Sequence, residues 1–259
     1  MLRELRLFFT ALQFFTRVPL PAWVGHSAPQ LDQATRYLPA VGMCVGALAA
    51  AVLWLAAQIL PLPLAVILSM VSGILATGAF HEDGLSDFVD GMGGGYTREK
   101  ILAIMKDSRI GAYGAIAIVL TLLIKYQVLL ALCGTRSLAY AAAALIAAHG
   151  VSRLMAVSLM VTQCYVRDDD SARAKPAAGK LNHVSFAIAL AFSAAALGIP
   201  LAAGASTATV LTALGAALLM RIYLAGLLQR KLGGYTGDCL GAVQQLTEIV
   251  FYLGLLATL

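Results

Sequence analysis

Charged residues are scarce in this chain. Asp, Glu, Lys and Arg together make up 12% of its 259 residues, whereas hydrophobic residues make up 60%. Soluble globular domains carry about 25% charged residues, so this composition excludes an ordinary water-soluble fold. The mean hydropathy of +0.84 is typical of a protein whose solvent is largely lipid. We therefore interpret the chain as an integral membrane protein.

Cysteine is also rare, and none of the four cysteines belongs to a CxxC pair. Cys44, Cys133, Cys164 and Cys239 lie far apart, which argues against a zinc site or a disulfide framework. The segment 1–17 lacks a small-residue cleavage site and carries charges at both ends and inside, so it predicts no cleavable signal peptide. Its Leu and Phe positions instead predict an amphipathic helix at the inner membrane interface.

Apolar runs long enough to cross a hydrocarbon core, which requires roughly 20 helical residues, recur throughout the rest of the chain. We expect one all-α membrane domain over residues 1–259, with an interfacial segment at 1–36 and about seven transmembrane helices. The predicted spans are 38–60, 62–80, 111–133, 137–160, 182–203, 206–228 and 239–258. The polar connections 81–110, 161–181 and 229–238 are predicted to be loops, and the first of them carries the catalytic residues.

The distribution of basic residues predicts the orientation of these helices. Fourteen of the eighteen Lys and Arg residues fall in the N-terminal segment and in the loops 81–110, 161–181 and 229–238, whereas the alternate connections contribute only Arg136. The positive-inside rule then places the N-terminus and every long loop in the cytoplasm. This predicts a multi-pass protein of the bacterial inner membrane whose active site faces the cytoplasm. The net charge of +5 indicates contact with anionic lipid and not with nucleic acid.

Acidic residues are concentrated in one stretch, between His81 and Gly114. It holds six of the thirteen in the chain, namely Glu82, Asp83, Asp87, Asp90, Glu99 and Asp107. If the preceding apolar helix continues through this stretch, Asp83, Asp87 and Asp90 share one helix face. Bare carboxylates on one face repel each other, whereas a divalent cation that prefers oxygen ligands lets all three stay ionised. The alternative is a solvated acidic face without a ligand.

Glycines and fixed cations accompany these acids. Gly84 and Gly91 leave no side chain beside the acidic face, so a phosphate-bearing ligand can approach the backbone there. Lys106, Ser108 and Arg109 follow shortly afterwards in the chain. This combination favours phosphoryl transfer, in which metal and guanidinium neutralise the charge on the transferred phosphorus group.

Residues elsewhere in the chain are further candidates for binding a phosphate. Arg153 and Arg221 fall near the inner ends of their spans, where they reach lipid headgroups or, if they face the bundle interior, a ligand. Thr236, Gly237 and Asp238 stand where the last helix begins. Asp238 is there either a helix cap or a ligand contact.

Three ionisable residues need a separate explanation. His81 at the rim of the acidic face is a general base, a nucleotide contact or a hydrogen-bonded structural residue. Glu248 lies within the last span, where a carboxylate is costly unless it faces a polar cavity. Lys125 also lies within a span, and the sequence suggests no function for it.

The motifs of the chain resemble those of the cobalamin synthase family. They are His81-Glu82-Asp83-Gly84 with Asp87 and Asp90-Gly91, Met105-Lys106-Asp107-Ser108-Arg109-Ile110-Gly111, Gly233-Gly234-Tyr235-Thr236-Gly237-Asp238, and Phe14-Phe15-Thr16-Arg17-Val18-Pro19. The resemblance covers essentially the whole chain. It implies a Mg²⁺-dependent inner-membrane transferase that joins adenosylcobinamide-GDP to α-ribazole, or to its 5′-phosphate, and releases GMP.

Residue roles follow as hypotheses from this resemblance. The predicted metal ligands are Glu82, Asp83, Asp87, Asp90 and Asp107. The predicted catalytic residues are His81, Asp83, Asp87, Lys106 and Arg109. The two cations would neutralise phosphoryl oxygens, while one carboxylate or His81 would accept the proton of the ribazole hydroxyl. The predicted substrate-binding residues are Gly84, Gly91, Ser108, Arg153, Arg221, Thr236, Gly237 and Asp238.

Two other functions compete with this one. The mechanism is similar to that of CDP-alcohol phosphotransferases, but the segment from Asp87 to Gly91 matches only the opening Asp-x-x-Asp-Gly of their motif, with no Ala-Arg after it. A transporter would need ionisable groups or broken helices near the bilayer midplane and access from both sides, whereas the acids here lie at the inner boundary. The sequence does not distinguish a monomer from an oligomer packed through lipid.

Overall fold

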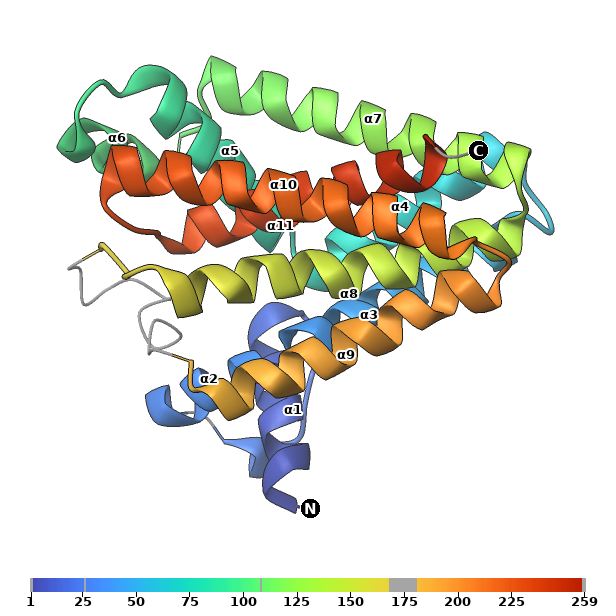
Figure 1. The fold of residues 1–259 in the computed structure, drawn as a ribbon, viewed down its shortest axis with the longest axis horizontal. Helices are drawn as coiled ribbons and strands as arrows, with labels where there is room; N and C mark the ends of the chain where they lie inside the picture. Colours follow the sequence, from blue (N-terminus) through green and yellow to red (C-terminus); the bar gives the residue numbers. More distant parts are fainter. Residues whose placement is uncertain (1, 26, 108, 168–180, 258–259) are drawn as a thin grey trace.

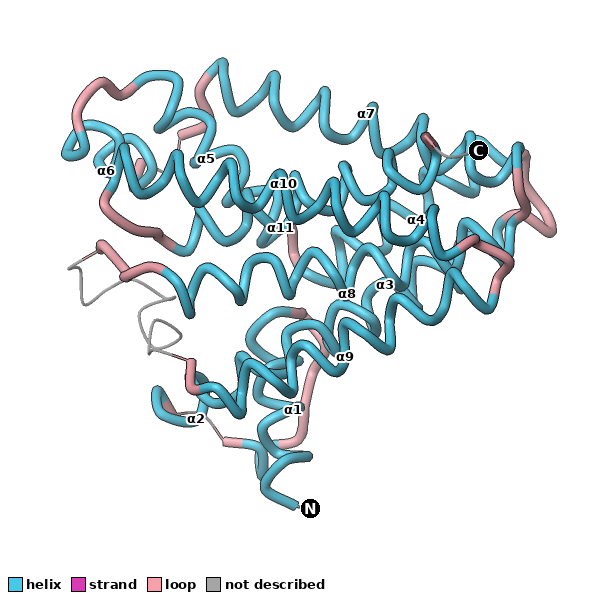
Figure 2. Tube along the Cα trace, viewed as in Figure 1, coloured by secondary structure: helices cyan, strands magenta, loops and turns pink. Residues whose placement is uncertain are grey.

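The computed structural model describes residues 2–25, 27–107, 109–167 and 181–257. Within these ranges the chain consists of helices joined by loops and turns, with one isolated bridge between Tyr165 and Tyr235 (Figures 1 and 2). The helices are α1 (Leu2–Phe15), α2 (Ala28–Ala34), α3 (Leu38–Ala56), α4 (Leu62–Thr77), α5 (Phe80–Gly94), α6 (Arg98–Lys106), α7 (Ala112–Thr135), α8 (Leu138–Thr162), α9 (His183–Ala202), α10 (Thr207–Leu232) and α11 (Gly237–Leu256), with 3₁₀ turns η1 (Ala22–Val24) and η2 (Thr35–Tyr37).

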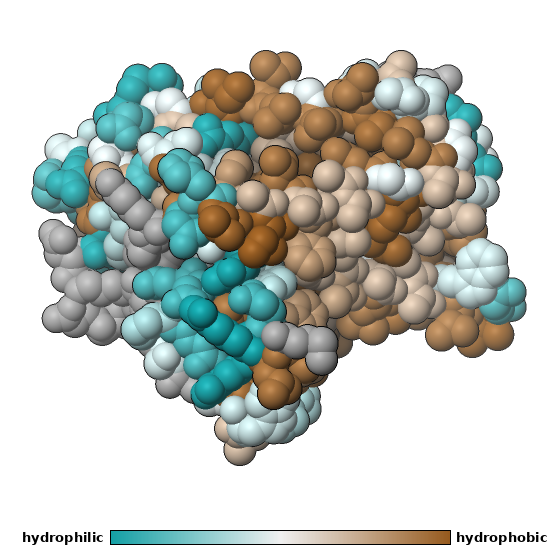
Figure 3. All heavy atoms as spheres, turned by 60° about the horizontal axis from the view of Figure 1, so that its bottom comes forward, coloured by the Kyte–Doolittle hydropathy of each residue, from teal (hydrophilic) through white to brown (hydrophobic). Residues whose placement is uncertain are grey.

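The described helices confirm the prediction of an all-α membrane protein. Six are long and apolar enough to cross a membrane, and the bent pair of α4 and α5 raises the number to seven if it counts as one span. On the face drawn in Figure 3, hydrophilic residues gather at the left end and hydrophobic residues cover most of the remainder. Ile116, Val119, Leu120 and Leu123 of α7 are more than half exposed, as expected for a helix that contacts lipid.

The first helix is amphipathic, as predicted. Leu7, Ala11 and Phe15 are buried at intervals of four residues along α1, which places them on one stripe of the helix. In Figure 1, α1 runs across the direction of the bundle helices. Its Glu4 accepts a hydrogen bond of 2.7 Å from the hydroxyl of Tyr37, so the helix is tied to the beginning of α3.

Small residues bring α3 and α8 together. Gly42 and Gly46 lie one turn apart on α3, and a Cβ atom at either position would collide with the backbone of α8 near Leu145 and His149. Such spacing of small residues lets two membrane helices approach closely. The contact places His149 and, one turn further along α8, Arg153 in the centre of the bundle, where both are buried.

The apolar helix before the acidic stretch does not continue into it. The axes of α4 and α5 are bent by 87° at the short break between them. Gly78 and Ala79 both adopt left-handed backbone conformations there, with φ of 66° and 59°. A left-handed residue cannot continue a right-handed helix, so α5 begins as a separate element.

The stretch 81–110, predicted as a loop, is largely helical instead, because it forms most of α5 and all of α6. Thr97 accepts a hydrogen bond from the backbone N–H of Lys100 and caps the start of α6. Ile101 and Met105 of α6 are buried against α5 near Gly91. Local propensity does not predict this packing, because the apolar stripe of α6 is only two turns long.

Candidate active site

Three acidic residues lie near one another where α5 packs against the beginning of α11. A Cβ atom at Gly84 would come within 3.1–3.3 Å of Asp238 and Gly241, so the two helices are in close contact here. This contact places Asp238 beside the acidic face of α5. The carboxylate of Asp87, which is half-buried, interacts electrostatically with those of Asp238 and Asp83. We call Asp83, Asp87 and Asp238 the acidic cluster.

Arg167 is the cation that the structure places at the acidic cluster, and the sequence did not point to it. Its guanidinium lies 3.2 Å from Oδ2 of Asp238 and also interacts with Asp87. The segment before Arg167 is held by two backbone hydrogen bonds of 3.0 Å between residues 164–166 and Tyr235. This pairing joins two loops about seventy residues apart, so no local motif indicates it.

Asp90, a predicted metal ligand, caps α7. One of its carboxylate oxygens accepts a hydrogen bond of 2.7 Å from the backbone N–H of Gly111, and the other accepts one of 2.9 Å from Gly114. A Cβ atom at either glycine would collide with the Asp90 carboxylate. Because carboxylates satisfy and stabilise the free N–H groups at a helix N-terminus, this contact fixes α5 against α7.

Glu82, another predicted metal ligand, points away from the acidic cluster into a buried polar cavity. Its Oε1 accepts a hydrogen bond of 3.0 Å from the side chain of Gln245. The residue before it, His81, is only 5% exposed and lines the same cavity. His81 and Glu82 therefore face the bundle interior, whereas the next residue, Asp83, belongs to the acidic cluster.

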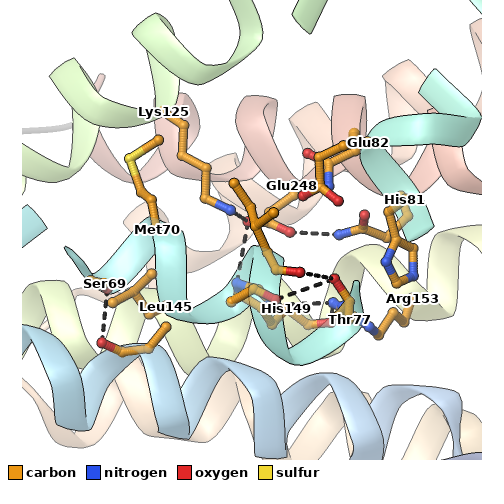
Figure 4. Close-up of a pocket in the computed structure, with 15 residues that line it drawn as sticks. Ser69, Met70, Thr77, His81, Glu82, Lys125, Leu145, His149, Arg153 and Glu248 are labelled. Carbon is orange, nitrogen blue, oxygen red and sulfur yellow. Dashed lines mark hydrogen bonds and ion pairs between the residues drawn. The ribbon is translucent and has the colours of Figure 1, made fainter. Parts of the chain in front are cut away.

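Glu248 lies at the centre of this cavity (Figure 4). Its Oε1 lies 2.5 Å from the ammonium of Lys125 on α7 and 3.4 Å from Nε2 of His149 on α8. Its other oxygen accepts a hydrogen bond from Gln244. The expectation that Glu248 needs a polar cavity is confirmed, and Lys125, for which the sequence gave no explanation, is its ion-pair partner.

The predicted residues at the end of α6 lie on the surface. The guanidinium of Arg109, 88% exposed, makes a 2.6 Å ion pair with Asp107. Hydrogen bonds from Arg109 hold the pKa of the Asp107 carboxyl at about 2. Lys106 is exposed in the last turn of α6, and Ser108 lies outside the described residues.

The remaining predicted binding residues have structural partners. Arg221 donates hydrogen bonds to Ser158 and Thr162 and so joins α10 to α8. Thr236, fully buried, caps α11 by accepting a hydrogen bond from the N–H of Cys239. Protein atoms fill the space beside Gly84 and Gly91, so helix packing explains these two glycines. Gly237 and Arg153 line a second, apolar cavity.

The chemistry of the acidic cluster suits a magnesium ion. Carboxylate oxygens are ligands that Mg²⁺ prefers, and among the described residues Arg167 balances only part of the negative charge of Asp83, Asp87 and Asp238. No three His, Cys, Asp or Glu side chains in the described part of the chain converge into a preformed coordination shell. Mg²⁺ is usually held by one or two carboxylates together with substrate phosphates, so the cluster fits a site that a diphosphate completes.

Comparison with known proteins shows the family of this chain. The family model described as cobalamin-5-phosphate synthase matches residues 7–256. The chain belongs to the cobalamin-5-phosphate synthase family. This bears out the resemblance seen in the motifs.

Curated relatives in this family match almost from end to end. The adenosylcobinamide-GDP ribazoletransferase of Shewanella frigidimarina is 46% identical over 99% of this chain and 96% of its own length. The enzymes of the same name from Shewanella oneidensis and Leptothrix cholodnii are 45% and 46% identical, over 98% and 99% of this chain and 95% and 97% of their own lengths. No solved structure matches the chain.

Proposed function

We propose that the chain transfers the phosphocobinamide group of adenosylcobinamide-GDP to α-ribazole, or to its 5′-phosphate, and releases GMP. The products are adenosylcobalamin, or its 5′-phosphate, and GMP. The observation that carries this proposal is the identity of about 45% to ribazoletransferases over essentially the whole chain. The acidic cluster supports it independently, because carboxylates beside a fixed cation suit phosphoryl transfer.

In this reaction a hydroxyl of the acceptor ribose attacks the phosphorus next to cobinamide. The bond from that phosphorus to the bridging oxygen breaks, and GMP leaves with the electron pair. A carboxylate of the acidic cluster or His81 accepts the hydroxyl proton. Asp83, Asp87 and Asp238 would hold Mg²⁺, which lowers the charge on the diphosphate and on the departing GMP.

The cations of this chain have distinct parts in the proposal. Arg167, already paired with Asp238, lies where it can contact the diphosphate oxygens. Lys106 and Arg109 stay candidates for the same task, and Arg109 would then exchange its partner Asp107 for a phosphoryl oxygen. Such charge-assisted contacts are strongest when guanidinium meets phosphate.

Membrane location and orientation belong to the proposal as well. The apolar helices support a multi-pass protein, and the basic residues of the N-terminal segment and long loops support an inner-membrane location with the acidic cluster in the cytoplasm.

The test is release of GMP by the purified chain in liposomes. We expect GMP only when adenosylcobinamide-GDP, α-ribazole and Mg²⁺ are all present, with loss of release on chelation by EDTA and recovery on adding excess Mg²⁺. GMP release that persists in EDTA would refute the requirement for Mg²⁺. A lack of GMP under all conditions would refute the proposed transferase activity. Release of CMP from a CDP-activated lipid in a parallel arm would favour the CDP-alcohol phosphotransferase alternative.

A further inference from the structure

An apolar cavity lies beside the contact between α5 and α11. Its empty space is about 470 Å³, a figure that includes open solvent at its mouth. Its walls come from α1, α5, α8 and α11 together with the beginning of α3. They consist mainly of apolar side chains, among them Phe14, Phe15, Phe80 and Met160.

The three phenylalanines form an aromatic corner. The rings of Phe14 and Phe15 lie edge to face with centroids 4.8 Å apart, and each meets Phe80 edge to face at 6.1 and 5.9 Å. Aromatic rings attract a further ring in offset-stacked or edge-to-face geometry. A flat aromatic ligand therefore suits this wall better than an aliphatic one of the same size.

Two buried polar atoms in the cavity wall have no hydrogen-bond partner among the described residues. They are Nε of Arg153, a donor, and Oε1 of Gln244, an acceptor. Both residues line this cavity and also the polar cavity around Glu248, and they are 2% and 1% exposed. Because buried polar groups are normally hydrogen-bonded, a ligand that reaches these two atoms would accept one hydrogen bond and donate another.

The cavity adjoins the acidic cluster. Phe80, Asp83 and Asp87 are spaced i, i+3 and i+7 on α5, so the aromatic wall and the acids follow one another along one stripe of the helix. On α11, Gly237 lines the cavity and Asp238 comes directly after it. A ligand in the cavity can thus extend a polar group towards the acids.

We propose that this cavity binds the aromatic base of the acceptor, an inference that rests on the function proposed above. α-Ribazole is the riboside of dimethylbenzimidazole, a flat apolar bicycle with one ring nitrogen free to accept a hydrogen bond. The base lies against the rings of Phe14, Phe15 and Phe80, and its ring nitrogen accepts the Nε–H of Arg153. A ribose hydroxyl donates to Gln244, and the ribose extends towards the acidic cluster.

The other aromatic bases of the substrates fit less well. Guanine, and the adenine of the adenosyl group, present polar atoms around most of their edges, and these would be left unpaired against a wall of phenylalanine and methionine. The corrin ring system is far larger than the cavity. The acceptor base is the flat, largely apolar group that remains.

Replacement of Phe14 by leucine tests the assignment, with Phe9→Leu as the matched control. Phe9 lies on the same helix and makes an edge-to-face contact with Trp23, at 5.8 Å, outside the cavity. The assay compares α-ribazole with imidazole riboside, which lacks the dimethylbenzo ring. We expect Phe14→Leu to raise the KM for α-ribazole by about 3- to 10-fold, as the loss of one aromatic contact implies. The KM for imidazole riboside and for adenosylcobinamide-GDP should stay unchanged, and Phe9→Leu should alter none of them.

The outcomes of this experiment distinguish failure of the cavity assignment from failure of the proposed function. GMP release by the wild-type chain is the readout of the function itself, and its absence would overturn both. If the wild-type chain releases GMP but Phe14→Leu leaves the KM for α-ribazole unaltered, the proposal that the cavity binds the acceptor base is refuted and the proposed function is not. An equal rise for both acceptors, or a rise for adenosylcobinamide-GDP, would also overturn it, because the lost contact would then not belong to the fused ring.

Discussion

The two aspartates of the Asp-x-x-Asp pair on α5 stand in different surroundings. Asp87 is half-buried among Asp83 and Asp238, with Arg167 as an opposing charge. Asp90 is 7% exposed and uses both oxygens to hold the backbone of α7. The same side chain three residues apart is therefore partly exposed beside other carboxylates in one case and used for helix capping in the other.

This difference predicts opposite results from the same substitution. Asp87→Asn removes a charge from the acidic cluster and should lower GMP release by at least about 100-fold, since even outer partners of a metal site contribute about 10- to 100-fold. Its thermal unfolding in detergent should match the wild type. Asp90→Asn turns one acceptor oxygen into an amide group and should lower the free energy of unfolding by about 1 kcal/mol, as for a lost helix cap.

Both variants are made in the same background and assayed at equal amounts of folded protein. Normal turnover by Asp87→Asn would contradict the assignment of Asp87. A wild-type unfolding temperature for Asp90→Asn would contradict the capping role.

At the scale of whole helices, one buried carboxylate ties three of them together. Glu248 on α11 contacts Lys125 on α7 and His149 on α8, and the neighbouring Gln245 connects α11 to Glu82 on α5. A charge inside the bilayer is tolerated where it is paired within the bundle. The network thereby fixes α5, and with it the acidic cluster, relative to the last helix.

Removal of one partner from this network should lower the free energy of unfolding. Lys125→Met leaves Glu248 without its closest cation, and breaking a buried pair costs about 3–5 kcal/mol. The double variant Lys125→Met, Glu248→Gln should recover much of that loss, because no unpaired charge is then buried. Thermal unfolding of the single variants and the double variant in detergent measures the coupling. Losses that simply add in the double variant would show that the pair is not coupled.

The sequence predicts the helices better than it predicts their contacts. Long apolar runs indicate spans such as α8 and α10 because about twenty residues must cross the bilayer. The sequence places the end of a span at residue 80, but it does not predict the left-handed conformation of Ala79, because alanine is a strong helix former. Asp87 could be predicted from helical spacing, whereas the contribution of Arg167 depends on pairing between distant loops.

The whole molecule is polar at one end and apolar over most of its length. The acidic cluster, Arg167 and Arg109 all lie towards the end of the bundle where α5, α6 and the start of α11 meet (Figure 1). Arg136 lies at the opposite end, in the turn between α7 and α8. This arrangement agrees with the charge asymmetry of the sequence, and the sidedness in a cell stays a prediction.

Native Cys164 offers a direct test of that sidedness. It is exposed and follows α8 at the end that carries the acidic cluster. In a variant with Cys44→Ser and Cys133→Ser, a membrane-impermeant maleimide should label inverted vesicles and leave intact spheroplasts unlabelled, because the positive-inside rule places this end in the cytoplasm. Buried Cys239 should not react in either.

The control for this experiment adds Thr135→Cys and replaces Cys164 with serine. Thr135 ends α7 at the opposite end of the bundle, so this variant should be labelled in spheroplasts. Labelling of Cys164 from outside would reverse the orientation and place the proposed reaction in the periplasm.

The pairing of Lys125 with Glu248 also has a consequence for biogenesis. During synthesis α7 enters the bilayer long before the ribosome has made α11, so until then Lys125 lies in the lipid or at its edge without the carboxylate of Glu248. The final helix then does more than complete the bundle, because its arrival neutralises a segment already inserted. A nascent chain that stops short of Glu248 would accordingly be a substrate for membrane quality control, even with its first ten helices translated in full.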